Sequence, residues 1–317
     1  MKRKTMNKSA LKWLFNLAVI GLIGYWSQTE MARSVLSKLL SIHWAFLAAM
    51  MGMSLLLMLI SSVRWARLIA AFGNPAPPIL ELLKLSLIGH FYNTFVPGAI
   101  GGDVLRATVT RAYYKKQNTS FLVVFSERAL GLLCLCLLLL VGLLNVPSEI
   151  LPHAKYLGLG GLGITVLIGC MIHFRERLLS FTQPYLDGLD QPSELIWAFG
   201  VSFVGQISTL TLFAIIVWAF GAELSLSTML FIFPLGLLAS VIPVTVLGAG
   251  ARELALISML INYGGLSETV AVSISTTYLG CLWFLGLIGG ILHLFNRRKT
   301  KTEKEARVGC DTTQSSD

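Results

Sequence analysis

The residues of this sequence that could carry chemistry are charged side chains inside or beside long apolar segments. They form three pairs, which are Asp103 and Arg106, Glu127 and Arg128, and Arg252 and Glu253. A charge at membrane depth is costly, so each of these side chains is a functional candidate by default. The broken segments around them therefore define the candidate site.

The first pair follows a stretch that cannot continue a helix. The helix-breaking residues of this stretch are Pro97, Gly98, Gly101 and Gly102, and Asn93 precedes them. Proline and glycine interrupt the helix and let backbone approach a ligand. A helix that starts at Asp103 points its free N–H groups into a cavity where a lipid phosphate could sit, and Arg106 could pair with that phosphate. The alternative is structural, with Asp103 as an N-cap that Arg106 neutralises at i+3.

The second pair lies about two turns inside the next apolar run. Glu127 and Arg128 are adjacent, so they point about 100° apart and cannot simply pair with each other. We expect Glu127 to reach Arg106 or Arg252, and Arg128 to reach Asp103. The alternative for Arg128 is a side chain that extends along the apolar surface to the membrane interface.

The third pair follows a second break, at Pro243, Gly248 and Gly250. Two charged tips of this kind fit a cavity that opens to alternate sides of the membrane, and the alternative is a salt-bridge cluster that only holds the two halves together. We expect one cavity near the membrane midplane. Its expected substrate-binding residues are Asn93, Pro97, Gly98, Gly101, Gly102, Asp103, Arg106, Glu127, Arg128, Gly248, Gly250, Arg252 and Glu253.

The composition places these residues in a membrane protein. Of 317 residues, 55% are hydrophobic and 13% are charged, against about 25% charged in soluble domains. The net charge of +9 arises at the ends of apolar runs, as the positive-inside rule requires, and does not indicate nucleic-acid binding. The sequence has no Walker A motif and no His-Glu-x-x-His motif, so we expect no cofactor and no metal.

The apolar runs predict an all-α polytopic fold. The expected helices cover 10–27, 44–71, 79–93, 103–116, 119–146, 156–174, 195–220, 227–240, 251–262 and 267–295, with irregular stretches at 94–102 and 241–250. These elements form a membrane domain over 1–296, and 297–317 is expected to be a basic, disordered cytoplasmic tail.

The membrane domain contains an internal repeat, about 10–146 and about 156–295. Pro97 corresponds to Pro243 and Gly101 to Gly248, and the run from Asp103 to Arg106 falls near Arg252 and Glu253. The Ser-x-x-x-Leu-Gly motif that ends at Gly131 recurs further on, ending at Gly280, and the offset stays between 146 and 149 residues. Four landmarks at nearly one offset indicate duplication.

The basic residues favour a topology in which each broken segment enters and leaves the membrane on one side. Six helices then cross, both termini face the cytoplasm, and Arg64, Arg111, Lys115 and Arg175 lie at cytoplasmic ends. Each repeat crosses three times, so the second repeat is inverted and the two re-entrant hairpins enter from opposite faces. Inverted repeats with broken helices are a transporter architecture, here expected in the inner membrane.

Three motifs in these segments point to one known family. They are the run from Phe91 to Arg106, the pair Glu127 and Arg128 with Gly131, and Pro243 with the run from Gly248 to Glu253. Together they resemble the lysylphosphatidylglycerol synthase transmembrane-region family, the flippase-like domain of the bacterial multiple peptide resistance factor. The resemblance covers about residues 10–295.

The resemblance implies translocation of aminoacylated phosphatidylglycerol, or of a related lipid such as a lipid-linked glycan, between leaflets. No aminoacyl-transferase domain follows the last apolar helix, so we expect no enzyme activity from this chain alone. The expected partners are a membrane lipid and a separate lipid synthase or glycosyltransferase. Two alternatives remain: a membrane enzyme acting on a lipid-linked sugar with Asp103 or Glu127 as base, and a non-transporting subunit that stabilises a synthase.

The topology predicts which side of the membrane each loop faces. A single cysteine at Lys115 should react with an impermeant maleimide only after the cytoplasmic side is opened, and one at Lys38 should react in intact cells, because basic residues concentrate on the cytoplasmic side. Labelling of the Lys115 position in intact cells would show that the re-entrant topology is wrong.

Overall fold

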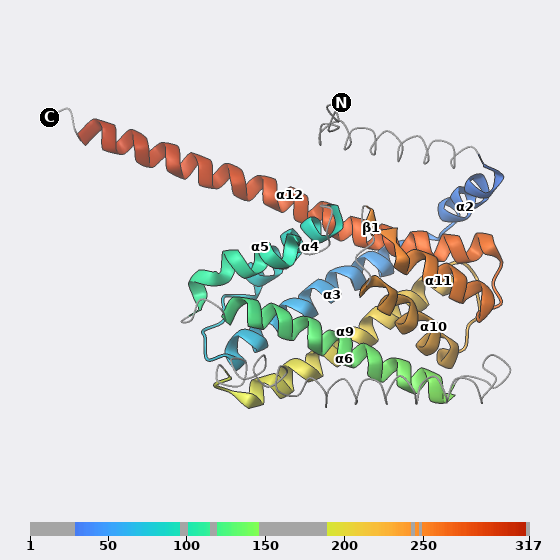
Figure 1. Ribbon diagram of the computed structural model, residues 1–317. Helices are drawn as coiled ribbons and strands as arrows, with labels where there is room; N and C mark the ends of the chain where they lie inside the picture. Colours follow the sequence, from blue (N-terminus) through green and yellow to red (C-terminus); the bar gives the residue numbers. More distant parts are fainter. Residues whose placement is uncertain are drawn as a thin grey trace, which may run out of the picture.

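The computed structural model of the chain describes residues 29–95, 101–114, 119–145, 189–241, 245–246 and 249–314. Its α-helices are α2 (Glu30–Leu40), α3 (Trp44–Ala71), α4 (Ile79–Phe95), α5 (Gly101–Val109), α6 (Thr119–Asn145), α9 (Pro192–Ala219), α10 (Leu226–Leu238), α11 (Ala251–Asn262) and α12 (Glu268–Gln314). Two short 3-10 helices, η1 (Thr110–Tyr113) and η2 (Ala239–Val241), follow α5 and α10. The helices form one bundle, beyond which α12 continues toward the C-terminus (Figure 1).

Four of the described helices are long and apolar enough to cross a membrane. They are α3, α6, α9 and the Glu268–Phe295 part of α12. A helix needs about 20 apolar residues to span the hydrocarbon core, and each of these has 27 or 28 residues. The expected helices at 10–27 and 156–174 lie outside the described residues. The described helices therefore confirm a polytopic α-helical membrane protein.

Most helix boundaries agree with the prediction, and α3 and α11 agree to the residue. The main correction concerns α5, which begins at Gly101 instead of 103 and ends at Val109, before η1. The start moves because the side-chain oxygen of Asn93 accepts the backbone N–H of Gly102 at 2.8 Å, so that a residue of α4 caps α5. A cap supplied by another helix is not visible in the local sequence.

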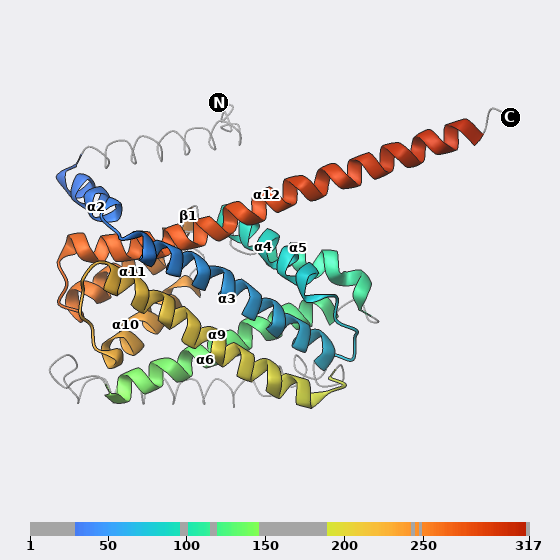
Figure 2. The same cartoon turned by 180° about the vertical axis from the view of Figure 1, so that it is seen from behind.

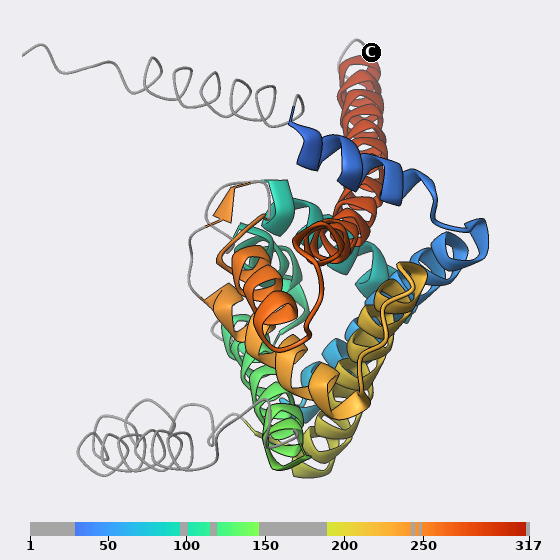
Figure 3. The ribbon, with the colours of Figure 1, turned by 90° about the vertical axis from the view of Figure 1, so that its right-hand side faces the viewer.

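The structure shows two further differences from the expectation. The stretch between the expected helices 10–27 and 44–71, which is expected to be an external loop, contains α2. Thr29 caps α2 by accepting a 3.2 Å hydrogen bond from the Ala32 amide, and α2 lies across α12 (Figure 3). The expected irregular stretch at 241–250 contains two paired two-residue strands, β1 (Thr245–Val246) and β2 (Ala249–Gly250). The helix α12 continues to Gln314, and the prediction that 297–317 is a disordered tail stays a prediction.

The helices pack in pairs that correspond between the two halves of the chain. Along one side of the bundle, α3 and α9 lie next to each other over most of their length (Figure 2). On one side α4 packs on α12, and on the other side α10 packs on α6. The helices α3, α4, α5 and α6 correspond in order to α9, α10, α11 and α12. With this correspondence the α3–α9 contact maps onto itself, and the α4–α12 contact maps onto the α10–α6 contact.

Two glycines occupy corresponding places in this arrangement. A Cβ on Gly289 of α12 would lie 1.9 Å from the carbonyl oxygen of Leu87 in α4, and a Cβ on Gly142 of α6 would lie 2.5 Å from the carbonyl oxygen of Leu230 in α10. The two glycines are 147 positions apart, which agrees with the repeat offset of the sequence. Each allows a spanning helix to approach the backbone of the other half's short helix.

The first broken segment is an antiparallel helical hairpin. At its base, the Tyr113 hydroxyl donates to Glu81 Oε1 at 2.7 Å, and this hydrogen bond raises the pKa of Tyr113. Nearer the tip, Gly89 and Gly102 bring α4 and α5 into backbone contact, since a Cβ on Gly102 would lie 1.9 Å from the Gly89 carbonyl oxygen. The segment therefore enters and leaves the bundle at the same end.

The second broken segment is a similar hairpin. A Cβ on Gly264, after α11, would lie 3.3 Å from Leu224 Cδ2, before α10, so the two ends of this segment also meet. Its start lies near the C-terminal end of α6, where Gly142 contacts Leu230. The base of the first hairpin lies near the N-terminal end of α6, because Tyr114, directly after η1, belongs to the same buried cluster as Val123. The described bases of the two segments therefore lie near opposite ends of α6.

The glycine crossings predict a difference between two glycines on α12. Gly289→Ala should destabilise the protein by about 1–3 kcal/mol, because the added methyl overlaps the α4 backbone. Gly280→Ala is the matched control, because a Cβ there meets nothing within 4 Å, and it should leave stability unchanged or slightly raised. The measurement is the thermal unfolding midpoint in detergent. Equal midpoints for the two variants would contradict the close crossing.

Candidate functional site

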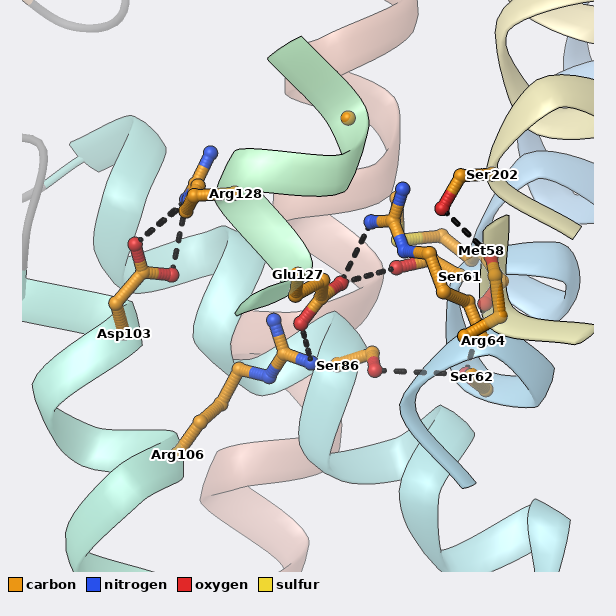
Figure 4. A network of polar contacts seen from close by, with 12 residues as sticks. Met58, Ser61, Ser62, Arg64, Ser86, Asp103, Arg106, Glu127, Arg128 and Ser202 are labelled. Carbon is orange, nitrogen blue, oxygen red and sulfur yellow. Dashed lines mark hydrogen bonds and ion pairs between the residues drawn. The ribbon is translucent and has the colours of Figure 1, made fainter. Parts of the chain in front are cut away.

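The centre of the site is the carboxylate of Glu127, whose side chain is 5% exposed. Arg64 Nη2 and the Ser61 hydroxyl donate to its Oε1 at 2.7 and 3.0 Å, and Arg106 Nη2 donates to its Oε2 at 2.7 Å. These side chains come from α3, α5 and α6, and Figure 4 shows them converging on the carboxylate. One buried anion thus joins two spanning helices and the first hairpin.

Arg106 is held between this carboxylate and an aromatic ring. Its guanidinium carbon lies 3.9 Å from the centroid of the Trp65 ring, a cation–π contact, and its side chain is 9% exposed. A Cβ on Gly89 would lie 2.8 Å from Arg106 Cδ, so the absent side chain at Gly89 makes room for the arginine stem. The hairpin positions this arginine through both of its helices.

Arg128 forms a second ion pair beside the first. It grips Asp103 with two nitrogens, at 2.9 Å from Nε to Oδ2 and 2.9 Å from Nη2 to Oδ1. The Asn93 amide donates to Asp103 Oδ1 at 3.2 Å. Of the two partners predicted for Glu127, the structure shows Arg106 and not Arg252. The predicted pairing of Arg128 with Asp103 is confirmed, and the alternative in which Arg106 neutralises Asp103 is wrong.

A polar cavity of about 150 Å³ lies against these ion pairs. It is large enough for several water molecules or a phosphate group. Its walls come from α3, α4, α5 and α6, and its polar lining residues are Ser61, Arg64, Ser86, His90, Asn93, Arg106, Glu127 and Arg128. Four residues of the predicted site, Asn93, Arg106, Glu127 and Arg128, therefore line one cavity.

A larger and more apolar cavity of about 580 Å³ adjoins the first. Arg64, Glu127 and Arg128 line both cavities, so the ion pairs stand between them. The rest of its wall comes from α6, α9 and α10, where its apolar lining residues are Phe125, Ala129, Leu132, Leu135 and Leu237. Gln206 of α9 bridges to α6 here by donating to the Gly131 carbonyl oxygen at 2.9 Å.

The second charged tip stays apart from this centre. Arg252 pairs with its neighbour Glu253, and its guanidinium carbon lies 5.3 Å from the centroid of the Tyr278 ring. The other Glu253 oxygen accepts the Gly250 N–H at 2.7 Å and so caps α11. Arg252 therefore does not fill the expected place beside Glu127, because a partner on its own helix neutralises it.

The remaining predicted residues have structural places or lie outside the description. Gly101 and Gly102 begin α5, and Gly102 is packed against Gly89. Neither lines the polar cavity. Pro97, Gly98 and Gly248 lie outside the described residues.

Sequence reasoning missed Arg64, Ser61 and Trp65. It assigned Arg64 to the cytoplasmic end of its helix, together with Arg67. The structure separates the two arginines: Arg67 meets Glu194 at the helix end, 3.1 Å away, and Arg64 turns inward to Glu127. The usable signal was the spacing of Ser61 and Arg64, which lie three residues apart and therefore on one helix face.

The buried anion predicts a large effect of a small substitution. Glu127→Gln should cost about 3–5 kcal/mol of stability, because it leaves Arg64 and Arg106 buried without their anion. Glu194→Gln removes a carboxylate from the more exposed pair with Arg67 and should cost less than about 1 kcal/mol. Thermal unfolding in detergent checks both variants. A loss for Glu127→Gln no larger than for Glu194→Gln would mean that the central pair is not a stabilising contact.

Comparison with known proteins gives one match. No curated protein and no solved structure matches the chain. The model of the family described as lysylphosphatidylglycerol synthase TM region matches residues 13–290, which include both hairpins and the whole charge cluster. A match over that much of the chain shows the family: this protein, a membrane protein of lipid-related function, belongs to the lysylphosphatidylglycerol synthase TM-region family.

Proposed function

We propose that this protein moves a phosphate-bearing lipid between the two leaflets of the inner membrane without changing it chemically. The observation that carries the proposal is the arginine-lined cavity beside Glu127, inside the span of the membrane-crossing helices. Glu127 lies eight residues after Thr119, the first residue of α6, which places it about 12 Å along the helix from its N-terminal end. A polar cavity at this depth is what a headgroup needs in order to cross.

The physical task of such a protein is to lower a solvation barrier. A charged headgroup is strongly disfavoured in the hydrocarbon core, whereas acyl chains are at home there. The polar cavity offers charges and hydrogen bonds to the headgroup, and the adjoining apolar cavity offers a place for the chains. No bond has to form or break.

The architecture that we propose is an inverted repeat of three crossing helices and one re-entrant hairpin per half. Three features support it: the corresponding helix contacts of the two halves, the corresponding glycine crossings, and the hairpin bases near opposite ends of α6. Alternating access would follow from rocking one repeat against the other. In this arrangement both termini face the cytoplasm.

The family match supports two kinds of substrate, an aminoacylated phosphatidylglycerol or a lipid-linked glycan. A separate lipid synthase or glycosyltransferase would supply either one. The enzyme alternative, with Asp103 or Glu127 as base, has less support, because both carboxylates are held by arginines and neither is free to take a proton.

A disulfide between the repeats provides the test. A Cβ on Gly286 of α12 would lie 3.6 Å from Thr94 Cβ at the hairpin tip, inside the range of about 3.5–4.5 Å for a disulfide. In a variant without the five native cysteines, Thr94→Cys with Gly286→Cys should stop leaflet movement of fluorescent lipid in proteoliposomes when oxidised, and reduction should restore it.

Each single-cysteine variant controls for the substitution itself, since Gly286→Cys also presses on Phe95. Movement that is equally fast in the oxidised and reduced double variant would count against rocking of the repeats. Conversion of the lipid to a product of different mass by the purified protein would overturn the proposal in favour of an enzyme.

A further inference from the structure

The polar cavity has hydrogen-bond donors to spare. The Nε–H groups of Arg64 and Arg106 are buried and have no acceptor among the described residues. Both arginines line the cavity, and each already uses another nitrogen to bind Glu127 (Figure 4). A buried donor without an acceptor is costly, so a ligand acceptor that reaches these N–H groups would be stabilised by them.

The cavity has no acceptor of comparable strength to spare. Within the described part of the chain, the carboxylates at this site are Glu127, which accepts from two arginines and Ser61, and Asp103, which Arg128 binds with two nitrogens. Three guanidinium groups against two carboxylates leave one excess positive charge.

The position of the apolar cavity adds a constraint on the shape of the ligand. It shares Arg64, Glu127 and Arg128 with the polar cavity, so a molecule that binds the arginines has apolar walls directly beside it. Phe125 and Leu132, which line these walls, are 52% and 44% exposed on the outside of α6, so the apolar cavity reaches the surface that faces the acyl chains. A water-soluble anion would leave this space unfilled.

We infer that the site selects a lipid with one anionic phosphate and no cationic group. This inference rests on the proposed function and narrows it: a plain phosphatidylglycerol or another phosphodiester lipid fits, and its lysylated form does not. The phosphate oxygens accept from Arg64 and Arg106 through N–H groups that do not bind Glu127. The excess positive charge of the site is then neutralised.

A lysylated headgroup meets the opposite conditions. Its ammonium groups are donors, and the carboxylates that would receive them are already bound by arginines. An ammonium in the same cavity also lies among three guanidinium groups, and like charges placed together are a strong device for excluding a ligand. The site therefore discriminates by charge, although the family name refers to a lysylated lipid.

The test is a lipid-binding panel with the purified full-length chain, measured by native mass spectrometry. The probes are phosphatidylglycerol, lysylphosphatidylglycerol, phosphatidylethanolamine and diacylglycerol with identical acyl chains. Phosphatidylglycerol should bind at least about tenfold more tightly than the lysylated form, as expected from one unfavourable charge contact. Equal or tighter binding of lysylphosphatidylglycerol would overturn the inference.

Arg64 and Arg67 of α3 give a pair of matched variants, because only Arg64 lines the polar cavity. Arg64→Gln should weaken phosphatidylglycerol binding about tenfold and reduce the preference over the lysylated lipid, because it removes the excess charge. Arg67→Gln, one turn away and outside the cavity, should change neither quantity. Equal losses in both variants would mean that the lipid binds at the protein surface and not at this site. If Arg64→Gln does not fold, the wild-type panel still decides.

The binding panel, combined with the leaflet-movement assay in proteoliposomes, separates this inference from the proposed function. Selective phosphatidylglycerol binding without leaflet movement in proteoliposomes would leave the charge selection intact and refute transport. Leaflet movement with a preference for lysylphosphatidylglycerol would support transport and refute the charge selection.

Discussion

The structure depends on the neutralisation of one buried carboxylate, that of Glu127. A carboxylate removed from water is stable only if cations and hydrogen bonds replace its hydration. Arg64, Arg106 and Ser61 provide this replacement from α3 and α5. Because these groups belong to three different helices, neutralising the anion fixes how α3, α5 and α6 meet, and with them the position of the first hairpin.

In the second half of the chain, the charged residues at the break, Arg252 and Glu253, pair with each other. Both lie on the same helix, and Glu253 also caps that helix through the Gly250 amide. Arg252 also lies over the Tyr278 ring of α12. The two halves therefore share a helical frame but not a charged centre, and under the proposed function the headgroup site belongs mainly to the first repeat, with the second repeat as the body against which it moves.

The glycine crossings connect this centre to a possible motion. Gly289 brings α12 onto α4, and Gly142 brings α6 onto α10, so both close crossings join one half of the chain to the other. The helix that carries Glu127 is thus in contact with the second hairpin, and the first hairpin is in contact with α12. A rocking of the halves would change both crossings at once and would carry Arg64, Arg106 and Glu127 together with the first half.

The sequence by itself determined the elements and part of the site. Apolar runs and helix breakers are local signals, so they predicted α3 and α11 to the residue and placed both breaks. They also predicted the pair of Arg128 with Asp103, and Arg106 as one of two partners for Glu127. Only the tertiary structure decided that Arg64 is the second cation on Glu127 and that Arg252 remains with Glu253, because these contacts depend on how each helix is rotated and crossed against its neighbours.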